Sequence, residues 1–185
     1  FANHLCVQGD RNYATLEIAY YKDNKDVTAD TLKDVDEGGI DPKDCAMKFF
    51  FNDGSEMRPT ESGIASGAMR GYLDMYNGGG VYASELGNEF DGMSNGVPYY
   101  REMINALANT MAEAFNDACV AGDMFSSKDG GEITAANIKV ADDWKNDALL
   151  ITKNADGKVA EGEELSNEYL NKIRAVIDKG LDFSI

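Results

Sequence analysis

The sequence predicts an α+β fold in which one long amphipathic helix packs with a small antiparallel sheet. The first 60 residues hold short runs rich in aromatic and β-branched residues, separated by turn residues, which is typical of strands. From residue 61 onward, apolar residues recur at helical spacing instead. We therefore divide the chain into a β-rich segment, 1–60, and a helical segment with a short strand, 61–185. We expect the two to form one compact unit excised from a longer chain.

Three runs in the β-rich segment are predicted to be strands: 4–8, 13–21 and 45–51. Each combines apolar residues with aromatic or branched ones, as half-buried strands do. Turn residues separate them, at Gly9-Asp10, Asp23-Asn24, Gly38-Gly39 and Asn52-Asp53-Gly54. The acidic stretch 22–44 lies between the second run and the third, and we expect it to be a solvated loop with at most a short helix.

The stretch 97–122 gives the strongest helix signal in the chain. Pro98 suits a first helical turn, where its missing N–H is not needed, and Gly122 suits a C-terminal cap. Large apolar residues recur every three or four positions between them, which predicts a helix that packs against other helices. Burial of such side chains stabilises a fold by roughly 1.5–3 kcal/mol each. The predicted helix-packing residues are Tyr100, Ile104, Leu107, Met111 and Phe115.

Two shorter stretches with helical periodicity, 61–76 and 163–179, are candidate partners for this helix. Gly67 and Gly71 lie four residues apart in the first stretch, which indicates either a close backbone approach or a weakened helix. The glycine-rich connection 77–96 is expected to be exposed and mobile. Farther along the chain we expect a short strand within 133–140 and a short helix within 141–150.

The charge balance is strongly acidic. Seventeen basic residues face 33 acidic ones, which gives a formal net charge of −16. Such a surface repels nucleic acids and anionic membranes, so we predict neither as a partner. The sequence also holds no apolar run of 18 residues and no visible secretory signal.

Signals for catalysis and for metal binding are weak. His4 is the only histidine, which argues against serine and cysteine triads and against multi-histidine metal sites. Cys6, Cys45 and Cys119 show no CxxC spacing. The stretch 152–163 matches part of an EF-hand loop, but a threonine stands where the first aspartate belongs, so a polar turn is favoured. We predict no catalytic residue, no cofactor and no metal, and a protein that is not an enzyme.

Several segments resemble, in the same order, the flagellar hook-associated protein 1 family. The segment 63–75, GIASGAMRGYLDM, is similar to the family's "SGxLGGLLDxR" segment. The stretch 97–122 resembles its helix of the form "LxxLAxxxAxAFNxxHxxG", in which Leu107-Ala108 and Ala114-Phe115-Asn116 match. Further resemblances lie at 4–9, 131–151 and 167–177, whereas 11–60 matches poorly and Cys119 departs from the pattern.

The resemblance implies a structural, non-enzymatic component of the bacterial flagellum that joins hook to filament. This chain would be the folded middle portion of such a protein, without its terminal helices. The implied partners are the hook protein and the next hook-associated protein or filament subunits. The full-length protein would be exported by the flagellar export apparatus and would assemble into a ring outside the cell, where it serves motility.

Two other functions stay open at this point. The first is an acidic extracellular binding or adhesion module without catalysis, which would use aromatic residues such as Tyr20, Tyr21 and 49–51. The second is an enzyme that relies on carboxylates, for which two acids would have to converge in a cleft.

Overall fold

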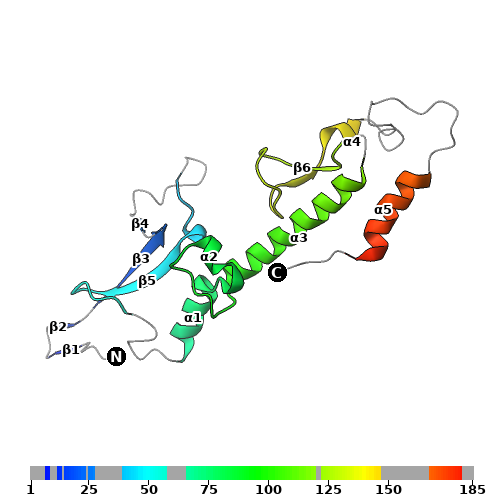
Figure 1. Cartoon of the computed structure of the whole chain (residues 1–185). Helices are drawn as coiled ribbons and strands as arrows, with labels where there is room; N and C mark the ends of the chain where they lie inside the picture. The colour runs from blue at the N-terminus through cyan, green and yellow to red at the C-terminus, as the bar shows by residue number, and fades with distance from the viewer. Residues whose placement is uncertain are drawn as a thin grey trace. The chain divides into compact units, whose positions relative to one another are not determined.

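A computed structural model describes residues 7–8, 12–13, 15–23, 25–27, 39–57, 66–119, 122–146 and 167–180. The predicted α+β class is confirmed, because helices accompany a small antiparallel sheet (Figure 1). The chain forms two compact units, Phe1–Arg101 and Glu102–Ile185, which we describe separately. The boundary between these units falls after Arg101, whereas the sequence predicts one compact unit that changes from strands to helices after residue 60. Among the described helices, none has the length and apolar character needed to cross a membrane.

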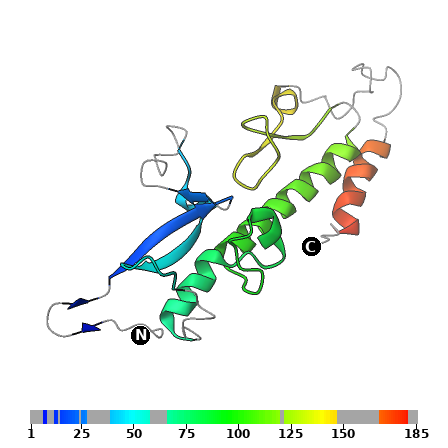
Figure 2. The same cartoon turned by 60° about the vertical axis from the view of Figure 1, so that its left-hand side comes forward.

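The sheet of the first unit has three antiparallel strands in the order β4-β3-β5. Strand β3 (Leu16–Lys22) pairs with β5 (Ala46–Phe51) along its length, from Leu16 opposite Phe51 to Tyr21 opposite Ala46 (Figure 2). Strand β5 lies within the predicted run 45–51, and β3 overlaps the predicted run 13–21 and extends one residue beyond it. Strand β4 (Lys25–Val27) falls inside the stretch expected to be a loop, and it pairs with the end of β3. Strands β1 (Val7–Gln8) and β2 (Asn12–Tyr13) form a separate antiparallel pair.

Helix α1 (Ala68–Asn77) packs against β5. It begins after Gly67, whose φ of 98° lies in the region that favours glycine. Phe51 and Met57 form a small core with Phe49 and Met69, and Leu73 of α1 is also buried. These contacts place the apolar side of α1 over one end of the sheet.

The outer edge of β5 is closed by a side chain of α1. The main-chain N–H of Met47 donates to Oδ1 of Asn77 at 2.8 Å, and Nδ2 of Asn77 donates to the carbonyl oxygen of Met47 at 2.7 Å. The carboxamide thus makes the two hydrogen bonds that a neighbouring strand would make. Farther along, Met57 N–H donates to the Phe49 oxygen, and Phe51 N–H donates to Ser55. This edge is therefore covered, as natural sheets require.

The connection 77–96 is exposed only in part: Val81 is 66% and Met93 is 97% exposed, whereas other residues of the segment are packed. Gly78, Gly79, Gly80 and Gly96 are buried, and the segment contains the 3₁₀ helix η3 (Gly80–Tyr82) and the one-turn helix α2 (Ala83–Leu86). Its hydrogen bonds run between main-chain groups, such as Gly96 N–H to the Gly78 oxygen and Gly79 N–H to the Asp91 oxygen, both 2.9 Å. Glycine allows the backbones to approach this closely, so the composition that suggested a mobile linker belongs to a packed one. Ala46, Ala83 and Phe90 form a second core here.

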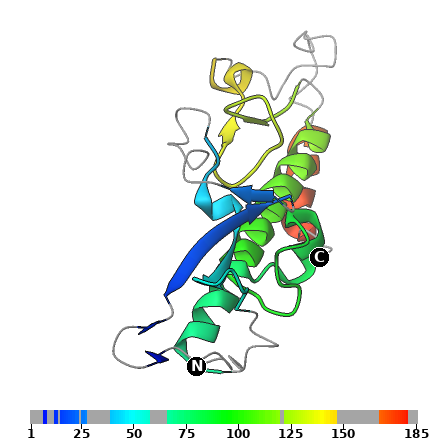
Figure 3. The same ribbon diagram turned by 90° about the vertical axis from the view of Figure 1, so that its left-hand side faces the viewer.

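Helix α3 (Val97–Ala118) is the predicted long helix, with 22 residues. It starts where expected and ends four residues before Gly122. Residues 97–101 belong to the first unit, and the remainder of the helix opens the second. The second unit also contains the hairpin of β6 (Phe125–Ser127) and β7 (Ile138–Val140), helix α4 (Asp142–Asn146), and helix α5 (Asn167–Lys179) (Figure 3). The elements β7, α4 and α5 lie within the stretches predicted for them.

A second asparagine repeats the Asn77 arrangement in this unit. Nδ2 of Asn116 donates to the Phe125 oxygen at 3.0 Å, and its Oδ1 accepts the Phe125 N–H at 2.8 Å. Asn105, three turns earlier on α3, accepts the N–H of Ala135 at 3.2 Å. The polar side chains of α3 therefore hold the segment that follows the helix.

Tyr76 ties the end of α1 to the short 3₁₀ helix η2 (Pro42–Asp44). Its hydroxyl donates to the carbonyl oxygen of Pro42 at 2.7 Å. Desolvation, together with the nearby Tyr20, Cys45, Asp41 and Asp44, raises the pKa of Tyr76 to about 12. The ordinary value is 10.0, so the folded chain disfavours the phenolate.

Replacement of Asn77 by alanine should destabilise the first unit strongly. The change leaves the N–H and C=O of Met47 without their partners, at a combined cost of about 2–4 kcal/mol. Asn109→Ala is the matched control, because among the described residues that side chain bonds the exposed Glu113 in the same helix, and it should change stability by less than about 0.5 kcal/mol. Urea unfolding of both variants measures the difference, and equal midpoints would contradict the role of Asn77.

Two glycines should respond to alanine in opposite directions. A Cβ on Gly71, inside α1, meets nothing within 4 Å, so Gly71→Ala should stabilise the unit by about 0.5–1 kcal/mol. A Cβ on Gly96 would overlap the main-chain oxygens of Asp74 and Met75, so Gly96→Ala should destabilise it. Thermal unfolding of the two variants tests this, and a destabilised Gly71→Ala would show that α1 needs its glycine for packing.

Stability should decline at alkaline pH in part because of Tyr76. Since its folded pKa of about 12 exceeds the ordinary 10.0, the unfolded chain releases the proton first, and stability is lost as pH rises from 10 through 12. Tyr76→Phe should flatten this decline while it lowers stability at neutral pH through the lost hydrogen bond. Denaturant midpoints measured from pH 8 to 12 provide the comparison.

Candidate functional site

The predicted helix-packing residues lie along α3, but most of them are not buried in this chain. Tyr100, Ile104 and Leu107 are 47%, 48% and 45% exposed. Met111 and Phe115 are partly buried, and the Phe115 ring meets Phe125 edge-on with centroids 5.8 Å apart. Phe115 therefore packs on a strand rather than on a helix. Within this chain no element covers the first three residues fully, and their role in packing against other helices stays a prediction.

A second face of α3 contacts the rest of the chain, and its residues come one position after the predicted helix-packing residues. Asn105, Ala108, Ala112 and Asn116 each follow such a residue directly, which turns them by about 100° around the helix axis. Ala108 and Ala112 are buried, and the two asparagines bond the segment after the helix. Small side chains let that segment approach the helix closely, so the large residues are left on the adjacent face.

We call the exposed face the α3 stripe and define it by Val97, Tyr100, Ile104 and Leu107. Val97 is 58% exposed, and the four residues are spaced three, four and three apart. No charged residue occurs from 103 to 112, in a chain of which 27% is charged. An apolar helical face of this kind marks a surface for contact with another apolar surface.

An apolar groove in the first unit adjoins one end of the stripe. It has a cavity volume of about 480 Å³. Its two cations, Lys43 and Arg101, pair with Asp41 and Asp44, the second pair at 2.7 Å. The groove is therefore apolar and locally neutral. Its lining comes from η2, β5, α1 and the first turns of α3: Lys43, Met47, Tyr72, Met75, Tyr76, Val97, Pro98 and Arg101.

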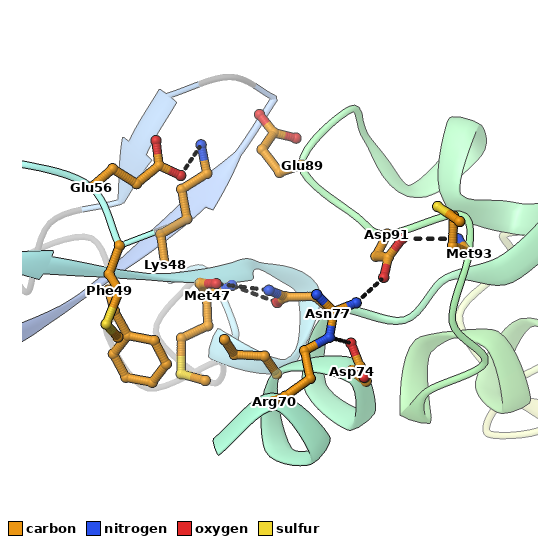
Figure 4. Close-up of a pocket in the computed structure, with 12 residues that line it drawn as sticks. Met47, Lys48, Phe49, Glu56, Arg70, Asp74, Asn77, Glu89, Asp91 and Met93 are labelled. Atoms are coloured by element: carbon orange, nitrogen blue, oxygen red, sulfur yellow. Dashed lines mark hydrogen bonds and ion pairs between the residues drawn. The ribbon is translucent and has the colours of Figure 1, made fainter. Parts of the chain in front are cut away.

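A second pocket, also within the first unit, is lined by residues of mixed charge and has a volume of about 230 Å³ (Figure 4). Arg70 contacts Asp74 at 2.7 Å and Asp91 at 3.6 Å, and Lys48 lies 3.9 Å from Glu56. Asp91 also accepts the Met93 N–H and the Ser94 hydroxyl. These groups bind one another and the loop, which gives the cluster a structural use. In the described part of the chain, no group of three or more His, Cys, Asp or Glu residues is placed to hold a metal ion.

Two of the cysteines are described, and both are free thiols. Cys45 is buried and Cys119 is half-buried. Desolvation is the main cause that raises the pKa of each thiol above its ordinary value. A raised pKa lowers the fraction of reactive thiolate, so neither cysteine has the character of a nucleophile.

The aromatic residues considered for an adhesion surface are engaged in packing. Tyr21 stacks on Phe50 with ring centroids 6.2 Å apart, and Tyr20 meets Tyr76 at 6.4 Å. Phe51 is buried. Cys6, His4 and the EF-hand-like stretch 152–163 lie outside the described residues.

Asn77, Asn116 and Asp91 connect the elements, and no sequence pattern marks their roles. Asn116 was visible only as part of the Ala-Phe-Asn match. A polar residue next to an apolar position on a helix is the available signal, and it is weak because most such residues are solvated.

Comparisons with protein-family models, with curated proteins and with solved structures found no match to this chain. The resemblance to flagellar hook-associated proteins therefore stays a prediction that rests on the order and spacing of its motifs.

Proposed function

We propose that this chain is a structural building block, the folded middle portion of a hook-associated protein that joins the flagellar hook to the filament. The observation that carries the proposal is the α3 stripe. It is apolar, the residues from 103 to 112 carry no charge, and 45% to 58% of the surface of each of its four residues is accessible. In the proposed role, helices from the rest of the full-length protein cover the stripe. Burial of that surface then stabilises the assembled state rather than the isolated chain.

The structure offers two further features that suit a load-bearing subunit. The side chains of Asn77 and Asn116 each join a helix to a strand, because each donates one hydrogen bond to a strand residue and accepts one from it. The acidic composition keeps the remaining surface solvated and discourages unspecific association. Under this proposal the partners are the hook protein and the next hook-associated protein or filament subunits. The full-length protein reaches them through the flagellar export apparatus and forms a ring.

The direct test is to express the full-length parent protein and to ask whether it co-assembles with hook protein. Deletion of the parent gene in its host should leave hooks without filaments, as seen by electron microscopy. Cells that keep normal filaments after the deletion would rule out the proposed junction role.

Acidic substitutions in the stripe should uncouple assembly from folding. Ile104→Asp and Leu107→Asp place a charge on the surface to be buried, which should weaken assembly by at least about tenfold because the carboxylate must be desolvated. The isolated chain should lose less than about 1 kcal/mol, since both positions are half-exposed in it.

The control for this experiment is Met93→Asp, at a residue that is 97% exposed on the loop before α3. This variant should assemble as the wild type does. Circular dichroism checks folding, and counts of filament-bearing cells measure assembly. Stripe variants that assemble normally would show that this face is not an assembly contact.

An acidic extracellular binding or adhesion module without catalysis is the alternative. The apolar groove of about 480 Å³ favours it, because its walls can receive apolar groups and its charges are already paired. A glycan array or a pull-down that yields one saturable ligand would support this alternative over the structural role.

A further inference from the structure

The sequence contains two Asn–Gly dipeptides, Asn77–Gly78 and Asn95–Gly96, and both lie in the connection between α1 and α3. Asn–Gly is the dipeptide most prone to spontaneous deamidation. Glycine has no Cβ to obstruct the backbone conformation in which its own nitrogen reaches the preceding side chain. The behaviour of Asn77 matters most, because its carboxamide closes the edge of the sheet.

The reaction needs only water. The main-chain nitrogen of Gly78 loses its proton and attacks Cγ of Asn77. The new C–N bond closes a succinimide ring, and the side-chain nitrogen leaves as ammonia. Water then opens the ring at one of its two carbonyl carbons, which gives either aspartate or isoaspartate.

The fold blocks this attack at Asn77. Gly78 N–H donates to the Asp74 oxygen at 2.9 Å, as part of the end of α1. Both polar atoms of the Asn77 side chain are held by Met47 (Figure 4). Neither the nucleophile nor the electrophile can rotate into place without local opening. Gly96 N–H is held in a similar way by the Gly78 oxygen, at 2.9 Å.

The fold also requires both residues of this labile dipeptide. An asparagine is required at 77, because it must both donate to and accept from the main chain of one residue. A glycine is required at 78, because a Cβ there would overlap the Asp74 oxygen and the Gly96 nitrogen. Two independent constraints therefore place a reactive pair at the centre of the first unit.

We propose that Asn77–Gly78 is a latent modification site that folding protects and that makes unfolding of the first unit irreversible. Once the chain is open, deamidation replaces the donor Nδ2 with a carboxylate oxygen. That oxygen would face the Met47 carbonyl across the 2.7 Å now occupied by a hydrogen bond. Isoaspartate would in addition lengthen the main chain at the end of α1. Either product prevents β5 from regaining its edge partner, so the modified chain does not refold. The lifetime of the native state then depends on how fast it unfolds.

The chain supplies an internal control. Asn116 makes the same pair of hydrogen bonds with Phe125, but it is followed by Asp117. An aspartate at this position slows succinimide formation, since its side chain hinders the attack. The same bonding arrangement in the second unit should therefore survive prolonged unfolding.

The test incubates the full chain at mildly alkaline pH, folded in buffer or unfolded in guanidinium chloride. Trypsin then releases 71–101, which contains both Asn–Gly pairs, and tandem mass spectrometry locates each deamidation. Asn77 should react at least about tenfold more slowly in the folded chain. The fraction that refolds should fall in step with modification at Asn77 and not with modification at Asn116. Equal rates in the folded and unfolded chains would overturn the proposal.

Two variants separate the contributions of the dipeptides. Asn95→Ser removes the second pair and should show the same loss of refolding as the wild type. Asn77→Asp imitates the main chemical change without incubation and should show the lowered midpoint of the deamidated chain at once. If Asn77→Asp keeps wild-type stability, or if Asn95→Ser abolishes the loss of refolding, the assignment to Asn77 is wrong.

Discussion

The first unit depends on one carboxamide that takes the place of a missing strand. Strand β5 has β3 on one side only, and its other edge would expose main-chain groups at Met47. Asn77 satisfies both of them from the last position of α1, and its own main-chain oxygen accepts the Asp91 N–H at 2.8 Å. Sheet, helix and the following loop therefore meet at one residue. Buried main-chain groups must find partners, so this single side chain fixes how α1 and its loop lie against the sheet.

Helix α3 shows how a helix can serve two purposes with adjacent faces. One face is lined by Asn105, Ala108, Ala112 and Asn116, and small or polar side chains there permit close contact and directed hydrogen bonds. The neighbouring face holds the large residues of the α3 stripe, which contribute little to the isolated chain. Area that remains accessible after folding is available for stabilising a larger assembly, and this division of labour is what the proposed structural role requires.

Local periodicity allowed α3, β3 and β5 to be predicted from the sequence, because apolar spacing directly reflects which face of an element is covered. The same spacing does not tell which face of α3 is covered within this chain, since a stripe of large residues looks the same whether its cover lies within the chain or outside it. Strand β4 is short and polar and leaves no alternation to detect. The packing of 77–96 depends on bonds between main-chain atoms, which no side-chain pattern records. Asn77 and Asn116 each bond the main chain of one residue, and no sequence pattern records such a bond either.

The bond between Gly96 N–H and the Gly78 oxygen has a topological consequence. It ties together the two ends of the segment that separates α1 from α3, so the segment is a closed loop whatever lies within it. Lengthening a loop whose ends are already joined costs only about 0.6 kcal/mol of chain entropy for each doubling. Met93 lies in this loop and is 97% exposed. The position after it is thus a suitable place for an inserted segment, a fluorophore or an epitope between the two helices.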